Sequence, residues 1–301
     1  MKTLVLDKSS LRAAPTQFLL QLRESYDFLL TGALLQEVGT RDVDKRTSMP
    51  KKEKRALNRK IEAQFAKAVK VAGNEWHDHL EALDWEITEG KSARFMPGLP
   101  LREPLDLDRF LDDETVQDCL AFDDAKASFA SFAAPVRNEE DEKVLARFMQ
   151  TPEEDFFCRL THQLASDTSS KKLRKTMTRL TEAGEERGRS KSPYLFPRRD
   201  WLVYGIALTH SVYLTWKLWK YGNEAPHKAA NAAYDLYYIA FMAIADGILS
   251  SDKNMLKLAW AVWPDKRKHI YEYHDERIDA LVPLWSSTSD EVDPEEPLPF
   301  L

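Results

Sequence analysis

Residues 231–260 read NAAYDLYYIAFMAIADGILSSDKNMLKLAW, and this stretch decides the predicted fold. Its first half belongs to an apolar pattern that predicts a helix over 225–245. Asp235 places a carboxylate among the apolar side chains of this helix. The short apolar run Gly247–Ser250 predicts a buried strand, and Asp252 then opens a second helix. A helix, a strand and a helix in this order predict a layered α/β arrangement.

The first forty residues repeat this alternation. Residues 3–6 (TLVL) and 26–30 (YDFLL) are short, apolar and β-prone, and each precedes a helical pattern, over 11–25 and 32–37 respectively. A strand–helix–strand–helix order predicts a parallel sheet. Residues 269–273 (HIYEY) alternate in polarity and predict one further strand at the edge of that sheet.

The chain between these two parts lacks the alternation. Its patterns are helical, and no strand is predicted between residues 45 and 198. We therefore expect a discontinuous α/β core over 1–45 and 198–275, split by a large helical insertion over 46–197 and followed by an acidic tail over 276–301.

The amino-acid composition excludes several classes of protein to which the chain could belong. The 301 residues are 43% hydrophobic and 31% charged with a net charge of -6, which favours a folded chain over a disordered one. Two cysteines exclude a disulfide scaffold and a cysteine-based zinc cluster. The apolar stretch 201–219 contains His210 and Lys217, so it predicts a core helix more strongly than a membrane span. With no signal-peptide pattern, we expect a soluble, cytoplasmic protein that makes no membrane contact.

Four acids fall at comparable places in the predicted elements. Asp7 and Asp252 directly follow strands, Glu37 lies on the helix after the second strand, and Asp235 lies on the helix that leads into the third. Ligands bind beyond the carboxyl ends of strands in open parallel sheets, so these acids are candidates for one site. Taken singly, Asp7 and Asp252 are better explained as helix caps. Asp235 is harder to explain, because a carboxylate among apolar neighbours needs an ion pair or a metal.

Converging carboxylates predict a metal site. They repel one another unless a cation lies between them. Oxygen ligands alone favour Mg²⁺ or Mn²⁺, which activate a water and offset charge on a phosphodiester. The pattern therefore indicates metal-assisted phosphodiester hydrolysis. Asp246 is predicted either as a further metal ligand or, with more weight, as a cap between helix and strand.

Together these stretches resemble the PIN-domain family of metal-dependent nucleases. The resemblance rests on LVLDKSSL around Asp7, on LTGALLQEV with Glu37, and on the segment 231–260 with Asp235 and Asp252. It implies a three-layer fold, a parallel sheet flanked by helices, in which these four acids are catalytic and hold one or two Mg²⁺ or Mn²⁺ ions. It covers under half of the chain, and the long insertion departs from the compact members of the family.

The resemblance implies an endoribonuclease that acts on single-stranded or looped RNA, with a toxin or defence effector as the biological setting by analogy. The basic segments 45–70 and 171–199 offer positive charge for a phosphate backbone, and they are equally compatible with solvated helix faces that balance the acidic segment 103–124. The predicted substrate contacts are Ser250, which fits the Ser or Thr that the family usually has two residues before its last Asp, Lys253, Asn231, Lys228, Arg198 and Arg199.

Two other interpretations stay open. The chain fits a non-catalytic interaction protein on a PIN-like scaffold, with the acids as helix caps and the insertion as a surface for a protein partner or inhibitor. It also fits a DNA or flap nuclease of related architecture. Metal binding separates the first interpretation from a nuclease, and cleavage of matched RNA and DNA separates the second.

Overall fold

The computed structural model describes residues 1–40, 50–73, 75–100, 143, 146–166, 199–222 and 233–273. Its elements, in chain order, are β1 (Lys2–Leu6), α1 (Lys8–Ala13), α2 (Thr16–Leu22), β2 (Tyr26–Thr31), α3 (Gly32–Thr40), α5 (Lys51–Ala72), β3 (Glu75–His77), α6 (His79–Glu89), η1 (Ala93–Phe95), β4 (Leu99–Pro100), α11 (Glu153–Ser166), α13 (Leu202–Tyr221), α15 (Ala233–Phe241), β5 (Gly247–Ser250), α16 (Lys253–Val262), η4 (Pro264–His269) and β6 (Ile270–Glu272).

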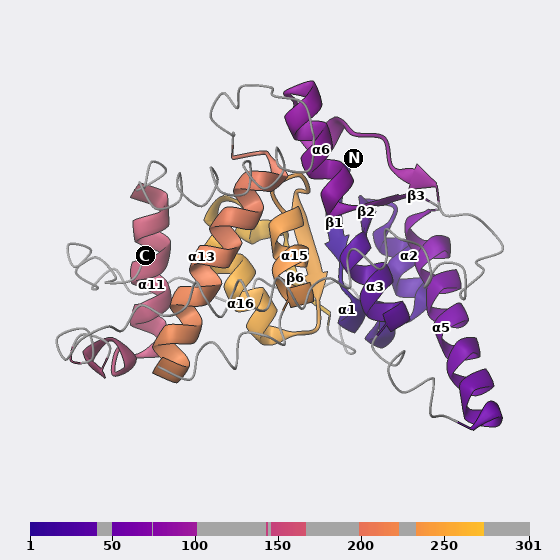
Figure 1. The fold of residues 1–301 in the computed structure, drawn as a ribbon, viewed down its shortest axis with the longest axis horizontal. Helices are drawn as coiled ribbons and strands as arrows, with labels where there is room; N and C mark the ends of the chain where they lie inside the picture. Colours follow the sequence, from indigo (N-terminus) through magenta and orange to yellow (C-terminus); the bar gives the residue numbers. More distant parts are fainter. Residues whose placement is uncertain are drawn as a thin grey trace.

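The strands form one six-stranded sheet in the order β4-β3-β2-β1-β5-β6 (Figure 1). The central strand β1 pairs in parallel with β2 on one side and with β5 on the other. β3 and β6 continue the parallel pairing outward, whereas β4 runs antiparallel to β3. The predicted α/β class is therefore confirmed, whereas the sheet, predicted to be parallel, is mixed because β4 runs antiparallel.

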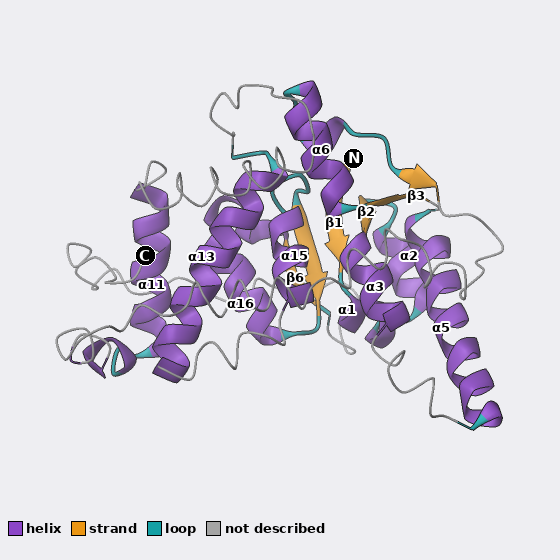
Figure 2. Ribbon diagram, viewed as in Figure 1, coloured by secondary structure: helices purple, strands orange, loops and turns teal. Residues whose placement is uncertain are grey.

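Helices lie on both sides of the sheet (Figure 2). α13, α15 and α16 pack together on one side, and α1, α2 and α5 pack together on the other (Figure 1). The strand between them is buried on both faces: Leu4, Val5 and Leu6 of β1 have no exposed surface. A strand covered on both faces reads as a continuous apolar run, which is why TLVL was recognisable in the sequence.

The predicted core helix over the apolar stretch 201–219 is confirmed as α13, which buries most of its side chains, including Tyr213 and Trp216. Among the described helices, none is both long enough and apolar enough to cross a bilayer.

One predicted helix, over 11–25, is two helices in the structure. α1 ends at Ala13 and α2 begins at Thr16, with the extended backbone of Ala14 and Pro15 between them. The physical reason is local, because proline lacks an amide hydrogen and disfavours the helical conformation of the residue before it.

The expectation of no strand between residues 45 and 198 is wrong. β3 pairs with the end of β2, through Leu30 opposite Trp76 and Thr31 opposite His77, and β4 extends the sheet by one more strand. Part of the predicted helical insertion therefore completes the sheet. Its described remainder is largely helical, in α5, α6 and α11.

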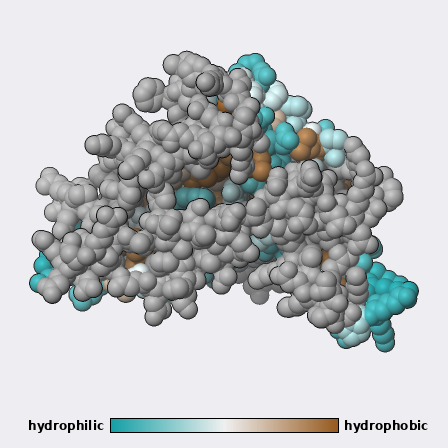
Figure 3. Space-filling view, in the orientation of Figure 1, coloured by the Kyte–Doolittle hydropathy of each residue, from teal (hydrophilic) through white to brown (hydrophobic). Residues whose placement is uncertain are grey.

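The basic segment 45–70 forms most of α5 from Lys51 onward, and Figure 3 shows the start of this helix as a hydrophilic projection. The acidic segment 103–124 and the tail 276–301 lie outside the described residues, as does the basic segment 171–199 except for Arg199.

Candidate metal centre at the carboxyl ends of the strands

The order in which strands are added to the sheet reverses between the neighbouring strands β1 and β5. The chain proceeds from β1 to β2 on one side and from β5 to β6 on the other. In open α/β sheets such a switch point leaves a crevice beyond the carboxyl ends of the strands, where ligands bind. Asp7 follows β1 directly, and Asp252 lies two residues beyond β5. The predicted shared edge of these two acids is therefore confirmed.

Asp7 is a buried helix cap, only 3% exposed. Its Oδ1 accepts a hydrogen bond from the backbone amide of Ser10 at 2.8 Å, which caps α1. Its Oδ2 accepts from the hydroxyls of Ser9 at 2.5 Å and Ser250 at 2.8 Å. Burial raises the pKa of Asp7, and these hydrogen bonds oppose the increase because they stabilise the ionised form.

The hydroxyl of Ser250 joins two of the acids. It donates to Asp7 and accepts from the backbone amide of Asp252 at 2.9 Å. Asp252 in turn caps α16, because its Oδ1 accepts from the amides of Asn254 at 2.8 Å and Met255 at 3.1 Å. The capping interpretation of Asp7 and Asp252 is confirmed, and one serine side chain holds the two caps in register across β1 and β5.

Glu37 and Asp235 come from helices on either side of this edge. Glu37 lies on α3, where its Oε2 accepts from the hydroxyl of Tyr238 at 3.0 Å and its Oε1 is 3.7 Å from Nζ of Lys8. Asp235 and Tyr238 lie one turn apart on α15. The contact between Tyr238 and Glu37 therefore brings the helix of the third predicted acid against the helix of the second.

The pKa of Asp235 depends on the charges of the other three predicted acids. The pKa of Asp235 is raised to about 7, by burial most and then, in order of size, by the negative charges of Asp252, Glu37 and Asp7, whereas the positive charge of Lys217 lowers it. Charges act on each other in this way only over short separations or through a poorly screening interior. The structure thus brings all four predicted acids into one electrostatic neighbourhood.

A hard divalent cation fits these residues by chemistry and by charge, because all four donors are carboxylates and they repel one another. The spacing of the oxygens does not fit. Among the described side chains, no three acids, histidines or cysteines lie close enough to hold one ion. The carboxylates of Asp7 and Asp252 are turned toward helix-capping amides.

Of the other residues predicted to contact substrate, Lys253 lies at the edge of the sheet with the acids and Arg199 does not. Lys253 begins α16 at the acid edge, with Nζ 3.7 Å from Oε1 of Glu272. Arg199 is paired with Asp265 at 3.1 Å, in the turn that precedes β6, so the structure does not bring it to the acids. Lys228, Asn231 and Arg198 lie outside the described residues.

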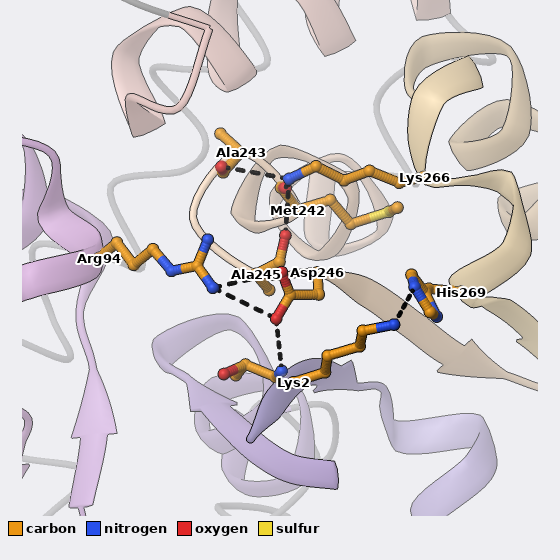
Figure 4. Close-up of polar contacts among 9 residues, drawn as sticks. Lys2, Arg94, Met242, Ala243, Ala245, Asp246, Lys266 and His269 are labelled. Carbon is orange, nitrogen blue, oxygen red and sulfur yellow. Dashed lines mark hydrogen bonds and ion pairs between the residues drawn. The ribbon is translucent and has the colours of Figure 1, made fainter.

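Asp246 lies at the opposite edge, where the strands begin (Figure 4). Its Oδ2 accepts from the backbone amide of Thr3 at 2.8 Å, and Nη2 of Arg94 lies 3.2 Å from Oδ1 and 3.3 Å from Oδ2. Nζ of Lys266 donates to backbone carbonyls of the turn ahead of β5, including that of Ala245 at 2.7 Å. Asp246 therefore lies between α15 and β5 as predicted, but the hydrogen bonds of its carboxylate go to β1 and to Arg94.

Lys217 and Tyr238 were not predicted as parts of this site. Lys217 is the one lysine or arginine in the apolar stretch 201–219, so it carried the same signal as Asp235, a charge where burial is expected. The position of Tyr238 one turn after Asp235 was also visible in the sequence. What was not visible is which acids the two side chains would meet.

Comparison of the chain with protein-family models, with curated proteins and with solved structures finds no match.

Proposed function

We propose that the chain is a metal-dependent nuclease of PIN-like architecture, an endoribonuclease that hydrolyses phosphodiester bonds of RNA. The observation that carries the proposal is the edge beyond β1 and β5, where the hydroxyl of Ser250 joins Asp7 to the backbone of Asp252. The charges of these two acids and of Glu37 act on Asp235. A half-buried acid near like charges lowers the stability of the fold, and such arrangements are found preferentially at functional sites.

In this proposal the four acids would hold Mg²⁺ or Mn²⁺ only after their carboxylates turn toward one ion, and such an ion would supply an activated water and offset charge on the phosphodiester. The chain itself supplies the positioning. Ser250 fixes Asp7 relative to the backbone of Asp252. Tyr238 fixes Glu37. The mostly parallel sheet, with acids beyond two neighbouring strands, supports the PIN-like assignment.

Asp235→Asn tests the proposal, with Asp27→Asn as the matched control. Asp27 is an exposed acid on β2, so both variants lose one negative charge. We expect Asp235→Asn to lower the rate of Mn²⁺-dependent RNA cleavage by a factor on the order of 10²–10³, as for the removal of one group that stabilises a transition state. Asp27→Asn should cleave as the wild type does. Equal rates for Asp235→Asn and the wild type would contradict the assignment.

Mn²⁺ titration by calorimetry provides a second readout that does not depend on cleavage. The wild type and Asp27→Asn should bind the ion, and Asp7→Ala and Asp235→Asn should bind it more weakly. A non-catalytic scaffold would show neither binding nor cleavage. Cleavage of RNA and DNA oligonucleotides of matched sequence tests the choice of substrate. Faster cleavage of DNA than of RNA would identify the activity as that of a DNA nuclease.

A further inference from the structure

α5 is a long helix with a strongly positive charge. It extends over 22 residues, Lys51–Ala72, and is about 33 Å long at 1.5 Å per residue. It contains eight lysines and arginines and two glutamates, so its net charge is +6, whereas that of the whole chain is -6. α5 therefore concentrates positive charge in a protein that is acidic as a whole.

The positive charge lies mainly on the side of α5 that faces away from the core. Ile61, Phe65 and Ala68 are buried on one side of the helix, which packs against α1, α2, α3 and β2. By helical spacing most of the basic residues fall on the opposite side, and six of them are exposed. We call these six the basic face: Lys51, Lys52, Arg55, Arg59, Lys60 and Lys70. Lys67 serves the fold instead, because its Nζ donates to the backbone oxygen of Ala14.

The basic face is unfavourable for the helix that carries it. Arg55 lies four residues from both Lys51 and Arg59, and like charges at this spacing destabilise a helix. Lys51 and Lys52 also place positive charge in the first turn, where the helix dipole favours acids and Glu53 is the only one. In the ranges that the structure describes, no ion pair neutralises any of the six side chains. The stability of α5 therefore does not account for the basic face.

The basic face begins on the side of the sheet where the acids lie. α5 belongs to the connection between the parallel strands β2 and β3 and ends just before β3. Such a connection returns the chain from the carboxyl end of one strand to the amino end of the next, so α5 starts beyond the carboxyl ends. In Figure 1 the start of α5 accordingly lies at the end toward which the arrow of β1 points. α5 also packs against α3, the helix that carries Glu37.

The residues of the basic face fit a phosphate backbone better than a protein or a membrane. The uncharged residues between the basic ones on this side of α5 are small, namely Ala56, Ala63 and Ala66. A protein partner is held chiefly by large apolar or aromatic anchors, and a membrane surface by apolar side chains that insert into it. A phosphate backbone is bound through charge alone, and the guanidinium groups of Arg55 and Arg59 can each donate two hydrogen bonds to a phosphate.

We propose that the basic face of α5 binds the phosphate backbone of a single-stranded nucleic acid. A helix that reads a duplex enters the major groove, whereas α5 is packed against the core along one side and can follow only one backbone. A strand that lies along α5 would extend from there toward the acid edge. The inference goes beyond the proposed function, because such binding requires neither a metal ion nor cleavage.

The double variant Arg55→Gln, Arg59→Gln tests this inference, because glutamine keeps the helix propensity of arginine and removes its charge. Lys143→Gln with Arg147→Gln is the matched control. These two residues are also helical, exposed and four positions apart, and they lie just ahead of α11, on the other side of the molecule from α5 (Figure 1). Binding of the full chain to a short fluorescein-labelled single-stranded RNA is measured by fluorescence anisotropy, in EDTA and over a range of salt concentrations.

We expect the wild type to bind this RNA and the Arg55, Arg59 variant to bind it about tenfold more weakly, as for the loss of two exposed ion pairs. The slope of log affinity against log salt should become shallower by about 1.4, the change for two lost phosphate contacts to a single strand. The control variant should bind as the wild type does. The melting temperature of the Arg55, Arg59 variant should equal or exceed that of the wild type, because repelling charges have been removed.

Several outcomes would overturn the inference. Equal affinity and salt dependence in the Arg55, Arg59 variant and the wild type would show that the basic face does not hold the strand. A lower melting temperature in the variant would show that these charges are used within the fold, as in the balance with the acidic segment 103–124. Equal competition by polyglutamate would assign the face to an acidic polypeptide, and tighter binding of duplex RNA would exclude the single strand.

The same measurements separate this inference from the proposed function. RNA binding in EDTA by a wild type that never cleaves RNA would remove the nuclease and leave the basic face as a nucleic-acid surface. Cleavage by the wild type, together with unchanged binding in the Arg55, Arg59 variant, would remove this inference and leave the nuclease.

Discussion

Glu86 is a buried acid that fastens α6 to the start of α13, and its ionisation should make the stability of the protein depend on pH. Its side chain is 1% exposed. Oε1 accepts from the backbone amides of Leu202 at 2.6 Å and Ala93 at 3.1 Å, and Oε2 accepts from Val203 at 3.0 Å. The N-cap residue of α13, Trp201, makes no side-chain hydrogen bond to the helix. The carboxylate of Glu86 caps α13 in its place, because it accepts from the first amides of the helix.

Burial raises the pKa of Glu86 from 4.5 to about 7, in spite of these three hydrogen bonds. The folded protein therefore keeps the proton of Glu86 after the unfolded chain has lost it. Stability from this group is greatest below pH 4.5, falls as the pH rises toward 7, and is constant above that. The full loss is about 3 kcal/mol, and about 2.5 kcal/mol of it develops between pH 5 and pH 8.

Glu86→Gln removes the titration. At pH 5 we expect this variant to be less stable than the wild type by about 1–3 kcal/mol, because an amide nitrogen cannot accept from the amides at the start of α13. Between pH 5 and pH 8 the wild type should lose about 2.5 kcal/mol more than Glu86→Gln, since all other groups titrate alike in both. Urea unfolding followed by tryptophan fluorescence measures this difference.

Glu89→Gln is the control, because Glu89 is an exposed acid in the last turn of the same helix. It should follow the wild type at both pH values. If Glu86→Gln lost as much stability as the wild type between pH 5 and pH 8, the carboxyl group of Glu86 would not be buried against α13 as described.

Three further changes test the packing around the acid site. Gly205→Ala should destabilise the protein by about 1–3 kcal/mol in urea unfolding, because the new methyl group meets the backbone oxygen of Ala240, and an unchanged midpoint would refute this close contact. Tyr238→Phe should lower stability by about 1.5–3 kcal/mol, since it removes a part-buried hydrogen bond to the carboxylate of Glu37, and an unchanged midpoint would refute that contact. Asp246→Ala removes the acceptor of a backbone amide and of an arginine at the other edge of the sheet, so it should lower the melting temperature without changing Mn²⁺ affinity.

The strands of the core could be read from the sequence because their short apolar runs are buried on both faces. β5 and β6 fall within the predicted runs, and β1 and β2 each exceed theirs by one residue, Lys2 and Thr31. β3 is different, because its residues Glu75, Trp76 and His77 contain a single apolar side chain. Its extended state comes from pairing with Leu30 and Thr31 in β2, and no local pattern records such a pairing.

The acid edge could be predicted because parallel strands place their carboxyl ends together, so chain order alone assigned Asp7 and Asp252 to one edge. The side chains that hold the acids could not be assigned in this way. Tyr238 and Glu37 are 201 residues apart in the chain, and they meet only because α15 packs against α3. Glu86 likewise resembles an ordinary acid of a surface helix until the start of α13 covers it.

The hydrogen bond from the hydroxyl of Ser250 to Asp7 joins residues that are 243 positions apart. Asp7 follows the central strand β1, and Ser250 ends the neighbouring strand β5. At roughly 5–20 residues per second, a ribosome needs on the order of 10–50 s to make the chain between them. Throughout that interval the nascent chain carries Asp7 without a complete β5 and without Asp252. The acid edge of the sheet is therefore assembled only after β5 has been made and has paired with β1.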